Sequence, residues 1–108
     1  MAETQSLQAL NVAWAARARV KTGRQRLIAG ELALAHILAD PPADDIVAQL
    51  QRVELARVLV WLPRVGDATA ARILEAARVL PTARIHALTT AQRVAIARAT
   101  DVYRPERP

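Results

Sequence analysis

The chain has 108 residues, which is enough for one domain with a modest core. Fifteen basic residues, all but one of them arginine, stand against ten acids and give a net charge of +5, which favours an acidic or polyanionic partner. The absence of cysteine excludes disulfides and cysteine-based metal sites, and the two histidines, His36 and His86, are isolated, so we predict no metal and no cofactor.

The first part of the chain predicts a long helix. Residues 4–29 are rich in alanine, leucine, arginine and glutamine and contain no proline. Gly23 weakens this helix, and Gly30 is its expected end, because glycine readily takes the left-handed conformation that closes many helices. Residues 1–30, with five cations and one acid, are therefore predicted to be a long basic helix.

The next segment predicts two short helices. The first runs from Glu31 to about Ala39, with apolar residues at helical spacing. Asp40 followed by Pro41 has the pattern of an N-cap and a first helical residue, and two further aspartates would complement the helix dipole. This third helix should end at about Leu50.

Residues 53–62 fit two structures. Val58–Leu62 is a continuous apolar run that a buried strand would also show. No partner strand is evident, and an isolated strand cannot satisfy its backbone groups. We therefore predict a buried helix that ends before Pro63, with Trp61 in the core.

Two longer helices are predicted to complete the fold. Residues 68–79 place apolar side chains on one face and charged ones elsewhere. Thr89 precedes Gln92 by the spacing of a capping box, which predicts a helix over 90–100. Residues 103–108, which include two prolines, are expected to form a flexible tail.

The predicted fold class is therefore all-α: a single small domain of five or six helices, with residues 31–102 forming its globular part. Enzyme motifs such as GxGxxG, the P-loop, the nucleophile elbow and HExxH do not occur. The first residues lack the basic start and apolar run of a secretory signal, and no apolar stretch approaches the ~20 residues that span a bilayer. We expect a cytoplasmic protein that does not enter a membrane.

The turn at 63–67 has the pattern of an anion-binding site. Gly66 lets the backbone approach a ligand closely or adopt a positive φ, and the helix that follows would present unpaired N–H groups. Arg64, just before Val65, would add a charged fork. In a chain this basic, the expected anion is a nucleic-acid phosphate. The alternative is an ordinary helix–helix turn whose glycine serves packing alone.

A second polar group, Thr82, Arg84 and His86, follows the next helix. We expect the Gly66 turn and the Arg84 turn to lie side by side at one end of the helical unit. Together they would form a concave surface of backbone donors, guanidinium groups and a hydroxyl. A solvated loop cation and a packing histidine are the alternatives.

The cations of the first helix are a candidate second DNA contact. Arg17, Lys21 and Arg24 fall on one helical face, and Arg19 and Arg26 fall on the opposite one. Contacts of this kind would reach phosphates without reading sequence. Alternatively, these charges only keep a long helix soluble.

The sequence resembles the actinobacterial integration host factors, which are small helical nucleoid-associated proteins. The resemblance rests on Leu62-Pro63-Arg64-Val65-Gly66, Ile73, Glu75, Pro81-Thr82-x-Arg84 and Gln92-Arg93, with looser matches at 18–30 and 37–40. It implies a helix-two-turns-helix unit over about 53–100, a unit also found in certain DNA glycosylases and a small-subunit ribosomal protein. It further implies a nucleoid location and sequence-tolerant binding of duplex DNA that stabilises bent DNA and assists an integrase. The DNA contacts that it implies are Arg64, Val65, Gly66, Thr82, Arg84 and His86.

The chain departs from this family at the implied contacts. The family tends to have basic residues where this chain has Asp67, Thr69 and Ala83, and arginine where it has His86. As an N-cap, Asp67 would occupy the helix N–H groups and repel a phosphate. We therefore predict weaker DNA binding than that of a typical member.

The function predicted from these features is that of a monomeric, non-enzymatic protein that binds double-stranded DNA, with a phage or plasmid integrase as a further partner. Two alternatives remain open. A structured-RNA-binding protein would use the same helical unit. A protein-interaction accessory to a recombinase would use the acidic segment 31–56, where five acids stand against one cation.

Overall fold

The computed structural model describes the backbone of residues 2–105 and the side chains of residues 7–105. The elements of this part of the chain are all helical and follow in the order α1 (Ala2–Ile28), α2 (Leu34–Leu38), α3 (Asp45–Leu50), α4 (Leu55–Leu59), α5 (Asp67–Ala77), the 3-10 helix η1 (Ile85–Ala87) and α6 (Thr90–Tyr103). The only β-type pairing within the described residues is an isolated bridge between Glu54 and Arg84. The predicted all-α fold is confirmed.

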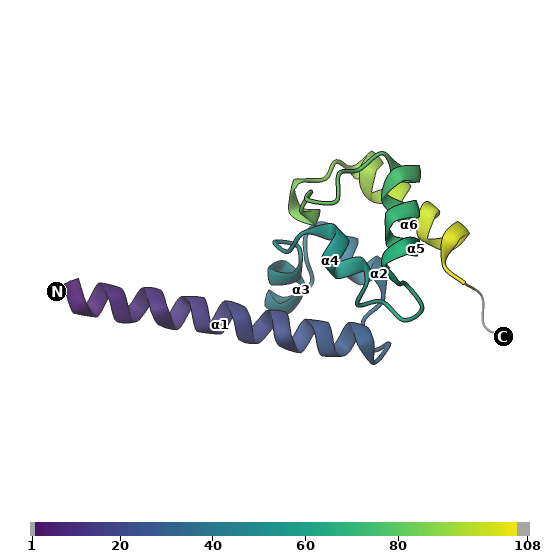
Figure 1. Cartoon of the computed structure of the whole chain (residues 1–108). Helices are drawn as coiled ribbons and strands as arrows, with labels where there is room; N and C mark the ends of the chain where they lie inside the picture. Colours follow the sequence, from purple (N-terminus) through teal and green to yellow (C-terminus); the bar gives the residue numbers. More distant parts are fainter. Residues whose placement is uncertain (1, 106–108) are drawn as a thin grey trace.

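The molecule is elongated because α1 extends beyond the other helices. Figure 1 shows the shorter helices packed around the C-terminal half of α1, while its N-terminal half projects alone. The overall extents are 55 × 28 × 24 Å. None of the described helices is both long and apolar enough to cross a membrane.

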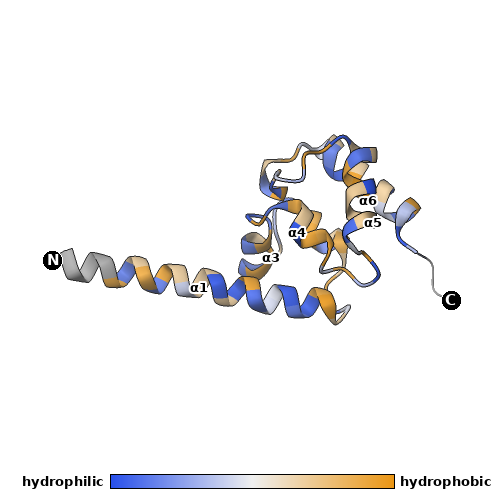
Figure 2. Ribbon diagram, viewed as in Figure 1, coloured by the Kyte–Doolittle hydropathy of each residue, from blue (hydrophilic) through white to orange (hydrophobic). Residues whose placement is uncertain are grey.

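The contact between α1 and α3 depends on Gly23. A Cβ built on this residue would lie 2.7 Å from Cδ1 of Leu50, a distance that real Cβ contacts do not show. Gly23 is therefore required for close packing of the two helices, a role that its sequence position did not reveal. Leu27, one turn further along α1, is fully buried in the same direction. Elsewhere α1 mixes hydrophilic and hydrophobic residues along its length (Figure 2).

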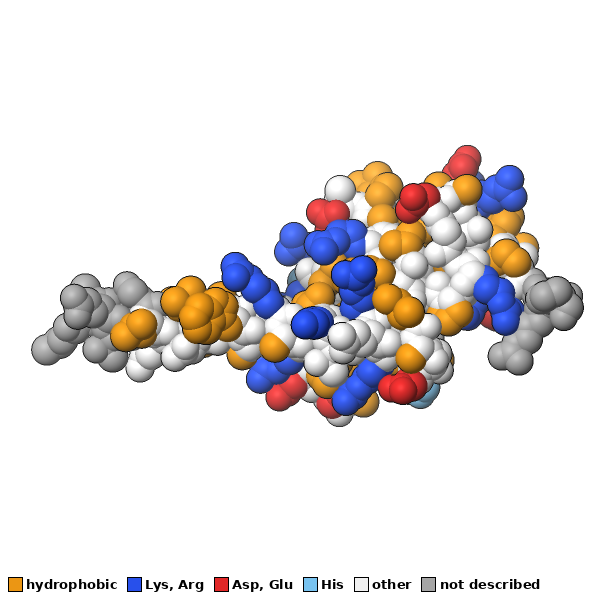
Figure 3. Space-filling model, turned by 60° about the horizontal axis from the view of Figure 1, so that its bottom comes forward, with side chains coloured by type: hydrophobic (Ala, Val, Ile, Leu, Met, Phe, Trp, Pro, Cys, Tyr) orange, Lys and Arg blue, Asp and Glu red, His pale blue; other side chains and the backbone are white. Residues whose placement is uncertain are grey.

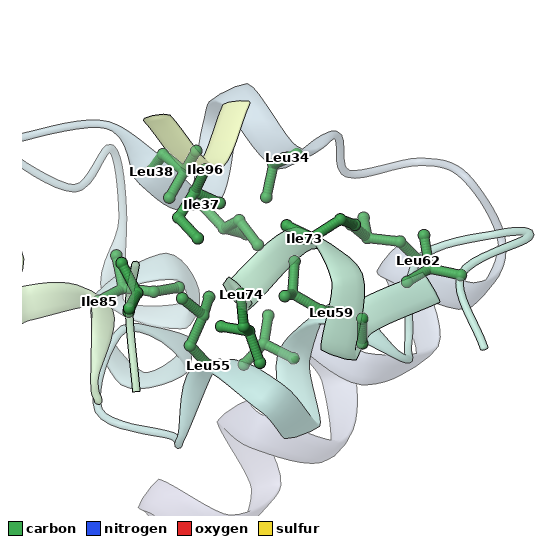
Figure 4. Packing of buried hydrophobic residues seen from close by; sticks show 14 of the residues in the cluster. Leu34, Ile37, Leu38, Leu55, Leu59, Leu62, Ile73, Leu74, Ile85 and Ile96 are labelled. Carbon is green, nitrogen blue, oxygen red and sulfur yellow. The ribbon is translucent and has the colours of Figure 1, made fainter. Parts of the chain in front are cut away.

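The core is made by the short helices together with the end of α1. Figure 4 shows side chains from α2, α4, α5, η1 and α6 pointing toward one another. The largest fully buried side chains are Leu27, Ile37, Leu50, Leu55, Val58, Leu59, Ile73, Ile85 and Ile96. Burying each of these side chains stabilises the fold by ~1.5–3 kcal/mol relative to leaving it exposed. On α5 the buried residues are Ala70, Ile73 and Leu74, as its apolar spacing predicted.

The end of α1 follows the prediction, but the start of the second helix does not. Gly30 takes a φ of +77° and closes α1. The N–H groups of Glu31 and Leu32 both donate to the carbonyl oxygen of Arg26, at 2.9 and 3.3 Å. These residues therefore belong to the closing turn of α1, and the predicted helix over 31–39 shrinks to the five residues of α2.

The predicted N-cap of the third helix is wrong. Asp44 holds that position, because its Oδ1 accepts a hydrogen bond of 2.8 Å from the N–H of Val47. Asp40 and Pro41 lie outside the helix. Pro41 is itself followed by Pro42, and a residue that precedes proline is disfavoured in the helical conformation.

The last helix begins as predicted and runs further. The Thr89 hydroxyl accepts from the Gln92 N–H at 3.1 Å, and the Gln92 side chain accepts from the Thr89 N–H at 2.9 Å, which completes the capping box. The helix continues to Tyr103, and Nε of Arg104 then donates to the carbonyl oxygen of Pro63 at 3.0 Å. The start of the predicted tail therefore contacts the α4–α5 turn, and its end lies outside the described residues.

Candidate nucleic-acid interface

The turn between α4 and α5 is anchored by one buried residue and exposes its neighbours. Val65 is only 4% exposed and packs into the core, so only its backbone is available to a ligand. Arg64 is exposed and takes a φ of 65°, in the left-handed region. Gly66 instead takes an extended conformation, with φ of −91° and ψ of −177°. The positive φ of this turn therefore falls on the arginine, a conformation that costs a non-glycine residue ~1–2 kcal/mol.

The N-terminus of α5 is open. Its first helical hydrogen bond joins the N–H of Ala70 to the carbonyl oxygen of Gly66 at 2.9 Å. The N–H groups of Asp67, Ala68 and Thr69 precede that bond, and no hydrogen bond among the described residues uses them. A Cβ built on Gly66 would meet nothing within 4 Å. Packing therefore does not require a glycine here, and the space beside Gly66, next to these donors, is open to a ligand.

The charges at this turn are mixed. Asp67 is the first residue of α5 and not its N-cap, contrary to the prediction; Gly66 holds the N-cap position and has no side-chain cap. The carboxylate of Asp67 is exposed, so it lowers the attraction for an anion although it does not block the N–H groups. Arg64 and Arg104 add two positive charges near Pro63.

The loop that carries the second predicted group lies over the start of α4. Thr82, Arg84 and His86 are all exposed, and fully buried Ile85 anchors the loop between them. The backbone of Arg84 pairs with that of Glu54, just before α4. This pairing holds the three polar side chains at the surface and away from the core.

Internal hydrogen bonds hold this loop in place. The N–H of His86 donates to the carbonyl oxygen of Gln51 at 3.1 Å. Arg93, on α6, is a structural residue whose guanidinium donates to three backbone carbonyls. These are the carbonyls of Leu38 (2.8 Å), Ile85 (3.1 Å) and Leu88 (3.4 Å). The loop is thus fixed to α2, α3 and α6 before any ligand is present.

The two turns do not lie side by side, so this part of the prediction is wrong. Gly66 is the N-cap of α5, whereas Arg84 lies in the loop that leads from the far end of that helix back to Glu54. The α4–α5 turn and this loop lie at opposite ends of α5 (Figure 1), a helix of 11 residues that spans about 16 Å at 1.5 Å per residue. The structure therefore presents two separate polar surfaces and not one concave clamp.

A third basic surface forms where α1 passes α4. Arg17, Lys21 and Arg24 line one open groove, as their shared helical face predicted. Across the groove lie Arg57 and Trp61. Trp61 packs against the core, as predicted, but it is only partly buried. The guanidinium carbons of Arg24 and Arg57 each lie 5.8 Å from its ring centroid.

The remaining cations of α1 lie outside this groove. Arg19 approaches Asp45, at the start of α3, with 3.9 Å between Nη2 and Oδ2. Arg26 is exposed near the end of the helix. Figure 3 shows basic side chains gathered along the part of α1 that meets the globular domain.

Sequence reasoning missed Arg57 and Trp61 as surface residues. Both lie in or beside the apolar run over 58–62, which hides their exposure. The available signal was their spacing, because residues four apart in a helix lie on the same side. Because Arg57 is charged and expected to face solvent, Trp61, four residues later, is expected on the same exposed side of an otherwise buried helix.

These surfaces offer the chemistry of anion binding. The Arg19–Asp45 contact is the one salt bridge found among the described residues, so most of the basic side chains face solvent without an internal partner. Within the same part of the chain, no group of three histidine or acidic side chains is placed to hold a metal ion. Guanidinium groups and backbone N–H groups are the donors that remain.

No protein-family model matches the sequence, and no curated protein is significantly similar to it. Among solved structures, the chain is similar to sIHF in its complex with an 8-base-pair palindromic DNA. The TM-score is 0.69 at 23% sequence identity, and the match covers 82% of this chain and 96% of that one. The chain therefore has the all-α fold of sIHF.

Proposed function

We propose that this protein binds double-stranded DNA through the phosphate backbone, with little sequence preference, and that it stabilises bent duplex. It is a binding protein and not an enzyme, and its place is the nucleoid. Assistance to a phage or plasmid integrase is part of the proposal. The protein whose fold it shares was solved bound to DNA, which supports a nucleic-acid ligand for this chain.

The observation that carries the proposal is the set of basic side chains without an internal partner. The chain holds a net charge of +5, and a single salt bridge occurs among the described residues. Basic groups that are exposed and unpaired can neutralise phosphates and displace the cations condensed on DNA, and this release of counterions drives sequence-independent DNA binding. Most are arginines, which can grip two phosphate oxygens at once.

The proposed contacts fall into three groups. At the α4–α5 turn, Arg64 supplies charge while Val65 and Gly66 supply backbone. On the loop, Arg84 supplies charge, and Thr82 and His86 supply weaker hydrogen bonds. The proposed second contact region on α1 consists of Arg17, Arg19, Lys21, Arg24 and Arg26. Arg19 contributes less than the others, because it forms an exposed ion pair with Asp45.

Separate contact regions on a small protein favour a bent ligand. Duplex DNA is stiff over distances much longer than this molecule, so a straight duplex meets only part of a convex surface. Arg64 lies in the turn before α5, Arg84 lies in the loop after it, beside Glu54, and the α1 groove is a further region. A duplex that curves gains contacts, and these contacts offset the energy of bending.

The direct test is a binding titration with a labelled duplex, read by fluorescence anisotropy. The double variant Arg64→Ala/Arg84→Ala is expected to bind roughly tenfold more weakly or worse, because each lost charge-assisted contact is substantial. The control Arg78→Ala/Arg98→Ala removes the same charge from exposed positions outside the proposed contacts and should bind nearly as wild type does.

Two further arms test the bent ligand and the class of nucleic acid. A DNA minicircle should compete better than the linear duplex of the same sequence, because its bending energy is already supplied. Equal competition by a structured RNA would instead favour the RNA-binding alternative. Unaltered binding by the Arg64→Ala/Arg84→Ala variant would refute the proposed contacts.

A further inference from the structure

The groove between α1 and α4 combines positive charge with an aromatic ring. Its volume is about 390 Å³, and Arg17, Lys21, Arg24 and Arg57 all line it together with Trp61. The other lining residues are alanine, valine and glutamine, so no carboxylate neutralises these four cations within the groove. A groove with this lining is suited to a ligand that carries several negative charges and also a flat apolar surface.

Trp61 packs against the core with one part of its ring, and its exposed part can contact such a ligand. It is partly buried, and the guanidinium carbons of Arg24 and Arg57 lie 5.8 Å from the ring centroid, near the outer limit of cation–π contact. Both arginines are exposed. Their guanidinium groups can therefore move onto phosphates and leave a face of the indole for a stacked base.

Paired DNA can contact the cations of this groove but cannot stack on its aromatic ring. Its phosphates can reach the cations, but the flat faces of its bases are covered by stacked neighbours and cannot contact Trp61. An unpaired nucleotide offers both a phosphate and a free base face. Stacking on an aromatic side chain within a basic groove is the usual way in which proteins hold single-stranded nucleic acid.

We propose that this groove binds an unpaired nucleotide of a DNA strand, with its phosphates on the four cations and its base on Trp61. This inference rests on the proposed function, because it names which form of DNA the second basic surface takes. The protein should accordingly prefer duplex that contains a short single-stranded gap. The interaction is with the face of the base, so little preference for base identity is expected.

The test compares three duplexes of equal length: fully paired, gapped with normal bases opposite the gap, and gapped with abasic sugars opposite the gap. The abasic gap carries the same charge and is at least as flexible, so tighter binding of the normal gap reports contact with the bases. Wild type should bind the normal gap about tenfold more tightly than the abasic gap. Trp61→Leu should abolish that difference, and Trp61→Phe, which keeps an aromatic face, should restore most of it.

A fluorescence arm reports on Trp61 directly. The chain has two tryptophans, and Trp14 is 56% exposed on the projecting part of α1. In the Trp14→Phe variant, Trp61 is the only indole, and its emission should fall on binding the normal gap and not on binding the abasic gap. This arm keeps the wild-type groove, so it does not depend on the stability of Trp61 variants.

The outcomes separate the two proposals. Failure of wild type to bind fully paired duplex would overturn the proposed function. Normal binding to paired duplex with equal affinity for the two gaps, or with unchanged Trp61 emission, would overturn only the inference about the groove. Loss of the gap preference in both Trp61→Leu and Trp61→Phe would show that bulk and not stacking matters, which also overturns it.

Discussion

Replacement of Arg64 by glycine should stabilise the fold and weaken DNA binding at the same time. Arg64 holds a φ of 65°, and the left-handed conformation costs a non-glycine residue ~1–2 kcal/mol. Glycine removes that strain but loses ~0.5–1 kcal/mol to the greater freedom of the unfolded chain. The net gain is therefore ~0.5–1 kcal/mol, which raises the melting temperature by roughly 2–6 °C in a domain of this size. Loss of one phosphate contact should weaken duplex binding about tenfold.

Arg78→Gly is the matched control. Arg78 caps the C-terminus of α5 with φ of 57° and ψ of 44°, so glycine there relieves the same strain and removes the same charge. Both variants should melt higher than wild type by circular dichroism, while only Arg64→Gly should lose affinity in an anisotropy titration. Equal loss of binding in the two variants would show that net charge, and not the α4–α5 turn, governs affinity. A lower melting temperature for Arg64→Gly would refute the argument from backbone strain.

Three further substitutions test separate parts of the account. Gly66→Ala should change the free energy of unfolding by less than about 1 kcal/mol, because the φ of Gly66 suits alanine. It should still reduce duplex affinity, because the new methyl group occupies the approach to the N–H groups of α5. Unchanged affinity would place the phosphate elsewhere. Asp67→Lys should strengthen duplex binding by roughly fivefold or more. Glu75→Lys makes the same charge change further along α5 and should strengthen binding less. Equal gains in the two variants would argue against a phosphate at the α4–α5 turn. Arg93→Ala should lower the free energy of unfolding by about 2–3 kcal/mol in a urea titration, because three buried or partly buried carbonyls lose a charged donor; a loss below about 0.5 kcal/mol would mean that these bonds do not hold the loop.

Local signals in the sequence were enough to locate the longer helices. The apolar spacing on α5, the Thr89–Gln92 capping box and the glycine at the end of α1 each depend on residues within one or two turns of one another. Such signals act over short distances in the chain and survive in the fold. The all-α class followed from them.

Errors arose where two local signals competed or where the answer was non-local. Asp40 and Asp44 are both plausible caps, and the adjacent prolines decided between them. The pairing of Arg84 with Glu54 joins residues far apart in the chain, and it holds the loop beside the start of α4 and away from the Gly66 turn. No local pattern encodes the direction in which a loop returns.

The basic groove illustrates the same limit at the level of function. The face that carries Arg17, Lys21 and Arg24 could be predicted from helical spacing. The position of Trp61 opposite that face could not be predicted, because the exposure of an apolar residue depends on which helix covers it. In this fold Trp61 stays partly exposed, with the guanidinium groups of Arg24 and Arg57 beside its ring.

The salt dependence of binding to fully paired duplex tests the central claim most directly. If the proposed contacts neutralise about six phosphates, the plot of log affinity against log salt concentration should be linear with a slope near −5. The Arg64→Ala/Arg84→Ala variant should show a slope that is shallower by about two. A wild-type slope close to zero would contradict a mechanism based on phosphate contacts and would remove the physical basis for the proposed function.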